Sequence, residues 1–333
     1  MYTILFANEL QVDVNGVIMK KRLSDLLLAL AVILSGCGKQ YDTTENSEKL
    51  QVVTSFYPVY LLAQAVTAGA DGVELRNMAQ PQTGCLHDYE LTIHDMKLLE
   101  GADVLIINGG GMESFLEQAL ERYPELVIVD TSAGIELMEE EEHHHHEGET
   151  EEEEDHTGHD HEGNPHIWLS PERAAHQAEN IAKALGELDI AEAELFMANA
   201  EAFHEGAHAL QEKAHEISGH EETHAAVFHE GFAYLAELFH MEVVFGVFAD
   251  EYEMPSAKEL AEATDEAKAH GIRFFLTAED NGKIYAETLA AELDEAIVLL
   301  DPLTTADEEG LSYLERMERN IGIVEKYWKE GAE

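Results

Sequence analysis

The chain has 333 residues, of which 45 % are apolar, so it can form two modest domains or one large one with hydrophobic cores. It contains 19 Lys and Arg against 69 Asp and Glu, which gives a formal net charge of −50. Such a surface repels nucleic acid and anionic lipid head groups and attracts cations, so we expect no nucleic-acid partner.

An export signal is predicted near the N-terminus. The basic residues 20–22 (KKR) precede a short apolar stretch, residues 26–34, which is well under the ~20 residues that a membrane-spanning helix needs. The sequence LSGC then ends at Cys37 and resembles the lipobox of bacterial lipoproteins, in which the cysteine is lipidated after cleavage. An ordinary buried helix is the alternative interpretation of this stretch.

We interpret residues 19–37 as a lipoprotein signal peptide, so that the mature protein is extracytoplasmic and is anchored to the cell membrane by a lipid on Cys37. Residues 1–18 are then an upstream extension that results from a mistaken start codon. Residues 38–50 form a polar tether. With Cys37 lipidated, Cys85 has no partner for an intrachain disulfide.

Strand and helix patterns alternate over residues 51–188, which we predict to form an N-terminal α/β lobe. Short β-rich runs predict strands at residues 52–55, 73–77, 104–108 and 126–130. Helical patterns lie near residues 58–66, 89–99, 113–122 and 171–186. Such alternation is typical of βαβ units on a mainly parallel sheet.

Residues 139–163 interrupt this pattern with a run of Glu and His that contains no core-forming side chain, so we predict a disordered surface loop. Its histidines are His143, His144, His145, His146, His156, His159 and His161. The loop is either a solvated charge run without a specific role or an auxiliary metal loop, a weak zinc trap that raises the local ion concentration.

A long helix is predicted at residues 189–218. After it, strand and helix patterns alternate again in a predicted C-terminal lobe, residues 219–333. Strands are predicted at 225–228, 242–247, 272–277 and 296–300, and helices at 230–239, 256–270, 284–293 and 308–329. The predicted fold class is therefore α/β, with two lobes that each hold a mainly parallel sheet flanked by helices, joined by one long rigid linker helix. Ligands of such sheets gather at the carboxyl ends of strands, so a metal site is expected between the lobes.

Four side chains in loops or at strand ends are candidate metal ligands. They are His87, His166, His229 and Asp301. Three imidazoles and one carboxylate form a tetrahedral set that suits Zn²⁺. Taken singly, each histidine is more often a capping or core hydrogen-bonding residue than a ligand.

An enzyme is the alternative of another class, because the zinc-protease signature HExxH occurs at residues 204–208 and again at residues 220–224. Chance matches are common in a chain so rich in His and Glu. The first match lies on the predicted linker helix, where positions i and i+4 share a face. The second match runs into a predicted strand, which is the wrong context for such a protease. A secreted zinc metalloprotease and an adhesin-like lipoprotein both stay open as alternatives.

Five segments carry a resemblance to a known family: TSFYPVYLLAQAV, LHDYELTIHDMKLLEGADVLIINGGGME, NPHIWLSP, FHEGFAYLAELF and LLDPL. Together, over residues 51–329, they resemble the metal-specific solute-binding proteins of ABC importers, and the zinc-uptake branch fits best. The resemblance implies two α/β lobes bridged by one long helix, with the metal between them. It also implies a monomeric, non-enzymatic receptor that binds Zn²⁺ with high affinity and delivers it to an ABC-type membrane permease.

By the same resemblance, His87, His166 and His229 are the imidazole ligands, and Asp301 lies where several relatives supply a carboxylate. Many relatives instead have a Glu after the third strand of the C-terminal lobe.

This chain has Ala278 in that register and Glu279 one place further on, so the fourth ligand is Asp301, Glu279 or a water. A second carboxylate would favour Mn²⁺, and a Mn²⁺ or Fe²⁺ receptor of the same family is therefore an alternative. Cys85 stands where relatives often have Pro or Glu, and we expect it to be a small buried residue rather than a soft ligand.

Overall fold

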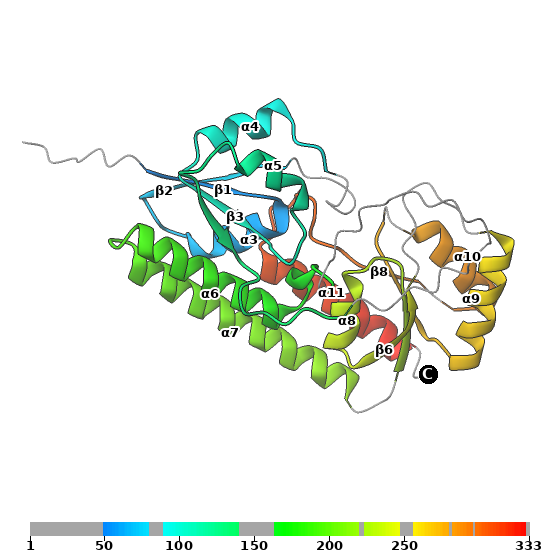
Figure 1. Cartoon of the computed structure of the whole chain (residues 1–333). Helices are drawn as coiled ribbons and strands as arrows, with labels where there is room; N and C mark the ends of the chain where they lie inside the picture. The colour runs from blue at the N-terminus through cyan, green and yellow to red at the C-terminus, as the bar shows by residue number, and fades with distance from the viewer. Residues whose placement is uncertain are drawn as a thin grey trace, which may run out of the picture. The chain divides into compact units, whose positions relative to one another are not determined.

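The computed structural model describes residues 49–79, 89–139, 163–219, 223–246, 256–279, 282–295 and 297–330, and Figure 1 traces the whole chain. Lys49–Glu333 form one compact unit. The predicted upstream extension, signal peptide and lipidated Cys37 lie outside the described residues, as do Cys85, His87 and the seven histidines of the Glu/His-rich loop. Within the described ranges, no helix has the length and apolar character that crossing a membrane requires.

The first sheet contains the four strands predicted for the N-terminal lobe. These are β1 (Leu50–Thr54), β2 (Val73–Asn77), β3 (Val104–Ile107) and β4 (Val127–Asp130). All neighbours pair in parallel in the order β2-β1-β3-β4. Parallel neighbours need crossover connections, and β1 and β2 are joined through the helix α3 (Tyr57–Val66). The central strands β1 and β3 are largely buried, as expected for a sheet covered on both faces.

The second sheet repeats this plan. Its strands are β5 (Thr223–Val227), β6 (Met241–Gly246), β7 (Phe274–Thr277) and β8 (Ile297–Leu299). They pair in parallel in the order β6-β5-β7-β8, with one register shift between Ala225 and Ala226. The crossover helices are α8 (Phe232–Leu238), α9 (Ala257–His270) and α10 (Lys283–Leu293). The same strand order in both sheets confirms the prediction of an α/β fold with two lobes of similar plan.

Several helical boundaries differ from the sequence-based expectation, and the helix predicted at 189–218 begins only at Ala193. The helix expected at 89–99 is α4 (Ile93–Glu100), because the Thr92 side chain accepts a hydrogen bond from the Asp95 N–H and ends the preceding loop there. The helix expected at 308–329 is α11 (Tyr313–Glu330), after Ser312 and Glu315 bond reciprocally in the same way. The helix expected at 113–122 is a short 3₁₀ turn, η2 (Ser114–Leu116), and one turn of helix, α5 (Glu117–Leu120).

Two long helices lie in the sequence between the last strand of the first sheet and the first strand of the second. The helix α6 (Pro171–Leu188) and the helix α7 (Ala193–Ser218) pack against each other along their length, as Figure 1 shows in green. The helix α7 also contacts α3 and, from the second half of the chain, α8 and α11. It therefore occupies the position predicted for the linker helix and contacts elements associated with both sheets.

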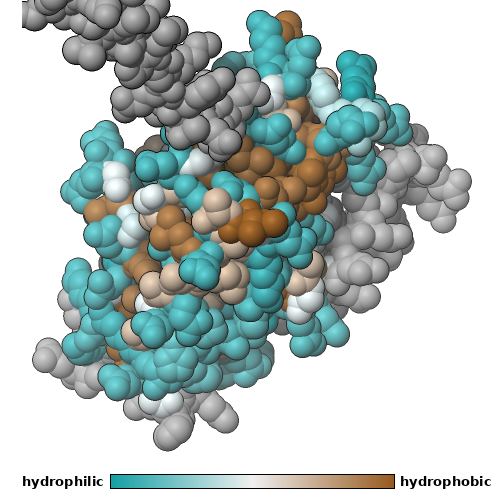
Figure 2. Space-filling view, turned by 90° about the vertical axis from the view of Figure 1, so that its left-hand side faces the viewer, coloured by the Kyte–Doolittle hydropathy of each residue, from teal (hydrophilic) through white to brown (hydrophobic). Residues whose placement is uncertain are grey.

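Large apolar side chains are mostly buried, but some reach the surface. Figure 2 shows one face, on which hydrophobic residues lie among hydrophilic ones. Among the described residues, the exposed large hydrophobic side chains are Ile93, Val127, Ile128, Leu188, Ile190, Met197 and Ile284.

Candidate metal centre

His229 follows a central strand of the second sheet. The strand β5 ends at Val227, and His229 lies two residues further on, in the turn before α8. The residue is only 4 % exposed, and its ring packs on Phe232 with 5.0 Å between the ring centroids. The carboxyl end of a central parallel strand is where ligands of such sheets bind. The structure therefore places His229 where its sequence position predicted.

The turn that carries His229 depends on a glycine. A Cβ at Gly231 would lie 2.5 Å from Leu169 Cδ1 and 3.0 Å from His166 Cβ. Only glycine lets this turn approach the His166 segment so closely. The Gly231 N–H donates to His229 Nδ1 over 3.1 Å, so that nitrogen carries a lone pair here. Binding a cation through Nε2 requires the other tautomer of His229 and the opening of this hydrogen bond.

His166 is fully buried at the start of the short 3₁₀ helix η3 (Ile167–Leu169). The Asn164 Oδ1 accepts a hydrogen bond from the His166 backbone N–H over 3.0 Å and lies 2.9 Å from Nδ1 of the same ring. Because an amide oxygen only accepts, Nδ1 must carry the proton, which leaves the lone pair on Nε2. Imidazoles that bind metals are oriented by such a bond on the opposite nitrogen.

The structure brings these two histidines together. The rings of His166 and His229 lie 5.1 Å apart between centroids and are almost perpendicular, at 77°. The Asn164 Nδ2 donates to the Glu230 carbonyl oxygen over 3.0 Å, so the backbone beside one histidine is tied to the backbone beside the other. Trp168 closes another side of His166 with ring centroids 5.0 Å apart. Two candidate ligands that are 63 residues apart in the sequence (229 − 166) thus lie side by side in the interior of the protein.

A polar network in the first lobe holds the His166 segment in place. The Asn108 side chain, directly after β3, donates to the Pro165 carbonyl oxygen over 2.8 Å. The Gln177 amide on α6 donates to Asn108 Oδ1 over 3.0 Å and to Thr131 Oγ1 over 2.8 Å. Residues at two strand ends and one helix therefore fix the backbone that precedes His166.

Glu113 is the buried carboxyl group of this network, and sequence reasoning did not single it out. Its Oε1 accepts hydrogen bonds from Ser55 Oγ and from the Asn108 N–H, both over 2.7 Å, and its Oε2 accepts from the Gly109 N–H over 3.0 Å. Burial raises the pKa of Glu113 to about 7, although these three donors act in the opposite direction. The available sequence signal was a glutamate after a glycine run at a strand end, within NGGGME.

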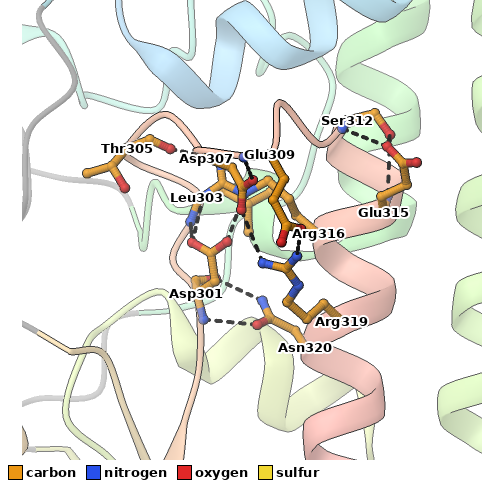
Figure 3. Close-up of polar contacts among 10 residues, drawn as sticks. All are labelled: Asp301, Leu303, Thr305, Asp307, Glu309, Ser312, Glu315, Arg316, Arg319 and Asn320. Carbon is orange, nitrogen blue, oxygen red and sulfur yellow. Dashed lines mark hydrogen bonds and ion pairs between the residues drawn. The ribbon is translucent and has the colours of Figure 1, made fainter.

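Asp301 lies just after β8, where its sequence position placed it, but its carboxylate already has a partner. The Arg316 guanidinium donates from Nε to Asp301 Oδ2 and from Nη2 to Oδ1, both over 2.7 Å, as Figure 3 shows. The Leu303 N–H also donates to Oδ1 over 2.8 Å. Asn320 accepts from the Asp301 N–H and donates to its carbonyl oxygen. In this structure Asp301 anchors the start of a loop onto α11.

The other candidates have other partners, cannot bind a metal ion, or lie outside the described residues. Glu279 is exposed and pairs with Lys283, with 2.5 Å between Nζ and Oε1. Ala278, in the register where relatives have a glutamate, is buried. Across the described ranges, no group of three or more His, Cys, Asp or Glu side chains is arranged to hold a metal ion. His87 is outside those ranges, so the complete ligand set stays a prediction.

The sequence matches a family model over residues 52–326, and that family is described as ZnuA, zinc-uptake complex component A, periplasmic. The chain is 30 % identical over 318 residues to the zinc-binding lipoprotein AdcA of Streptococcus pneumoniae, and this match covers 92 % of this chain and 61 % of AdcA. It is 28 % identical to the high-affinity zinc uptake system protein ZnuA of Bacillus subtilis, and this match covers 92 % of this chain and 98 % of that protein.

The fold agrees with these sequence matches. The structure of Zn(II)-bound AdcA from S. pneumoniae is similar with a TM-score of 0.67 and 26 % identity, over 84 % of this chain and 57 % of that one. This chain therefore spans about three fifths of the length of AdcA (61 %) but nearly all of the Bacillus relative (98 %).

Proposed function

Because this chain belongs to the family of the periplasmic component A of zinc-uptake complexes, we propose that it is an extracytoplasmic receptor that binds Zn²⁺ with high affinity and delivers it to an ABC-type membrane permease. The observation that carries the proposal is the buried pair of imidazoles, His166 and His229, whose ring centroids lie 5.1 Å apart. Imidazole nitrogen is a preferred donor for Zn²⁺, and a buried pair has little competition from water.

The proposed ligands are His87, His166 and His229, with one further oxygen donor. Asp301 could supply that donor only if it exchanged its hydrogen bonds with Arg316 for the metal. Glu279 would have to leave its ion pair with Lys283 and turn inward from an exposed position. A water is the third candidate, and it requires no such exchange.

The chemistry of this site suits holding an ion rather than catalysis. Neutral imidazoles bind trace zinc strongly, and a site closed by four donors has no open position for a substrate. Release then requires that the two histidine-bearing segments separate, which docking on the permease would trigger. In this proposal residues 51–188 and 219–333 are the lobes, residues 189–218 are the rigid linker helix, and the receptor is a monomer.

Two further features belong to the same proposal. Residues 19–37 would direct export and Cys37 would carry the lipid anchor, with residues 38–50 as its tether. The Glu/His-rich loop at 139–163 would be an auxiliary zinc trap beside the main site.

The decisive experiment measures zinc retained against a competing chelator. The chain is loaded with Zn²⁺, dialysed against a chelator of intermediate affinity that strips weak sites, and analysed by elemental mass spectrometry. The chain should keep one equivalent, whereas His166→Ala and His229→Ala should each lose it. His87→Ala tests the third predicted ligand in the same way.

His94→Ala is the matched control, because His94 is an exposed histidine on α4, outside the buried pair. This variant should retain zinc like the original chain. Retention of the tight equivalent by both His166→Ala and His229→Ala would refute the proposed site. Binding should also weaken below about pH 6.5, where protons compete for imidazole.

A further inference from the structure

The outer face of α7 carries a second pair of histidines that the main site does not use. His204 and His208 are one helical turn apart, both are exposed, and they lie beside the buried positions Phe203 and Ala207. Residues at i and i+4 share a face of a helix, and two imidazoles at this spacing can bind one metal ion together. The first HExxH match of the sequence therefore places two exposed imidazoles on one face of α7, at a spacing from which both can reach one metal ion.

The neighbouring helix α6 presents a matching row of side chains. The Gln211 Nε2 on α7 donates to Glu172 Oε2 on α6 over 3.2 Å, which fixes how the two antiparallel helices are aligned. Counting seven residues forward from Glu172 on α6 and seven residues back from Gln211 on α7 places Glu179 opposite His204. Four residues along α6 from Glu172 bring His176 to the level of His208.

Two observations support this alignment. The pKa of Glu179 is lowered, first by its hydrogen bond with Lys183 and in addition by the charges of His176 and His204, as expected for a carboxylate on the side of α6 that faces His204. Glu172 and His176 of α6 also line one cavity together with Gln211 of α7, which agrees with the alignment at this end of the helices, although His204 and His208 do not line that cavity.

Both rings of the pair are available to a ligand. Neither His204 nor His208 forms a hydrogen bond or ion pair with another part of the chain that the structure describes. Three donors do not yet converge among the described side chains, so a third donor must come from a rotation of exposed side chains. Because that rotation orders flexible groups, such a site is weaker than a buried one.

We propose that His204 and His208 of α7 form a second, surface site for Zn²⁺, which His176 or Glu179 of α6 completes across the helix seam. Glu179 would exchange its ion pair with Lys183, 2.7 Å in length, for the metal. The site shares no residue with the buried pair of His166 and His229. It also needs no part of the Glu/His-rich loop.

The test is histidine footprinting of the full chain with diethyl pyrocarbonate, read by peptide mass mapping, with the main site already filled. Peptide mapping separates His204 and His208 from the histidines at 143–161. Added ZnCl₂ should slow modification of both residues over the same concentration range. In His208→Asn the protection of His204 should be lost, because chelation couples the two rings.

Glu205→Gln is the matched control, because Glu205 is exposed and lies between the two histidines in sequence but points away from His204 on the helix. It should keep full protection of both rings. Protection of His204 that survives His208→Asn, or the absence of any zinc-dependent protection, would overturn the proposal. A half-protection concentration that is unchanged in a His176→Asn, Glu179→Gln double variant would overturn the part assigned to α6. Because the main-site variant His166→Ala leaves this pair intact, failure here is distinguishable from failure of the receptor function.

Discussion

The two sheets have the same strand order, but their strand ends carry different chemistry. In the first lobe, Ser55, Asn108 and Thr131 follow β1, β3 and β4 and bond to one another through Glu113 and Gln177. In the second lobe, the strand ends after β5 and β8 present an imidazole and a carboxylate. Topology therefore fixes where a ligand site can form, and the individual side chains decide what each strand end contributes to it.

The buried Glu113 and the partly buried Asp301 show the same contrast. Glu113 in the first lobe is compensated by three neutral donors, whereas Asp301 in the second lobe is compensated by the Arg316 guanidinium. Arg316 is only 2 % exposed, so it depends on this carboxylate in turn. The first lobe stabilises a buried acid without a counter-charge, whereas the second lobe pairs a partly buried acid with a buried arginine.

Removing one partner of that ion pair should have the largest effect on stability. Asp301→Asn leaves the buried Arg316 charge uncompensated, and we expect the free energy of unfolding to fall by roughly 3–5 kcal/mol. Asp130 at the end of β4 is the counterpart in the first lobe. Within the described part of the chain, its Oδ1 accepts from the N–H and Oγ of Ser132 in an exposed turn, so Asp130→Asn should cost under about 1 kcal/mol.

Urea denaturation of the two variants checks this difference, and zinc retention measured on Asp301→Asn separates anchoring from ligation. A destabilised variant that still keeps its tight equivalent would assign Asp301 to anchoring alone. Equal destabilisation by Asp130→Asn and Asp301→Asn would contradict the contrast between the lobes.

The order of strands and helices was predictable because each element carries its own local pattern. Alternating β-rich and amphipathic segments imply crossovers, and crossovers imply that strand ends meet at one edge of a sheet. His166 and His229 were found in this way, as loop or strand-end histidines. Their convergence is a tertiary fact that depends on Gly231 and Asn164, which carry no local signal of that role.

The partners of the two acids were not predictable for the same reason. Glu113 and Ser55 are 58 residues apart, and Asp301 and Arg316 meet only because α11 packs beside β8. A charge pattern on α11 alone cannot distinguish a solvated arginine from the buried Arg316. The Asp301 position was thus predicted correctly, while the hydrogen bonds that occupy its carboxylate were not.

The raised pKa of Glu113 should make the stability of the chain depend on pH. The pKa of Glu113 is raised to about 7 in the folded chain, so between about pH 4.5 and 7 the unfolded chain releases a proton that the folded chain keeps. Stability from this group is therefore present below about pH 4.5, falls as the pH rises through that window, and levels off above about 7. The expected loss is on the order of 3 kcal/mol.

Urea denaturation at pH 5 and pH 8 isolates this contribution when it is compared with Glu113→Gln, which cannot ionise. The exposed Glu117→Gln is the control and should behave like the original chain. The same change in stability between the two pH values in all three proteins would show that Glu113 is already ionised in the folded state at pH 5.

The smallest expected difference in stability is between variants at the starts of two helices, one in each lobe. Thr92 begins α4 and Ser256 begins α9, and each forms a capping box with the residue three places on. In the first lobe Asp95 is 1 % exposed and accepts from the Thr92 N–H, from Thr92 Oγ1 and from Tyr89 Oη. Thr92→Ala removes a donor from a buried carboxylate in addition to a cap. Ser256→Ala removes only an exposed cap.

We therefore expect Thr92→Ala to lower the free energy of unfolding by about 2 kcal/mol and Ser256→Ala by about 0.5–1 kcal/mol. Paired urea denaturation curves at one pH measure both values. A larger loss in Ser256→Ala than in Thr92→Ala would contradict the extra contribution that we assign to the Thr92 bond with the buried Asp95 carboxylate. Because Thr92 lies just beyond the segment that carries His87, its loss also tests whether the first lobe positions that predicted ligand. Thr92→Ala should then bind zinc more weakly, while Ser256→Ala should leave zinc retention unchanged.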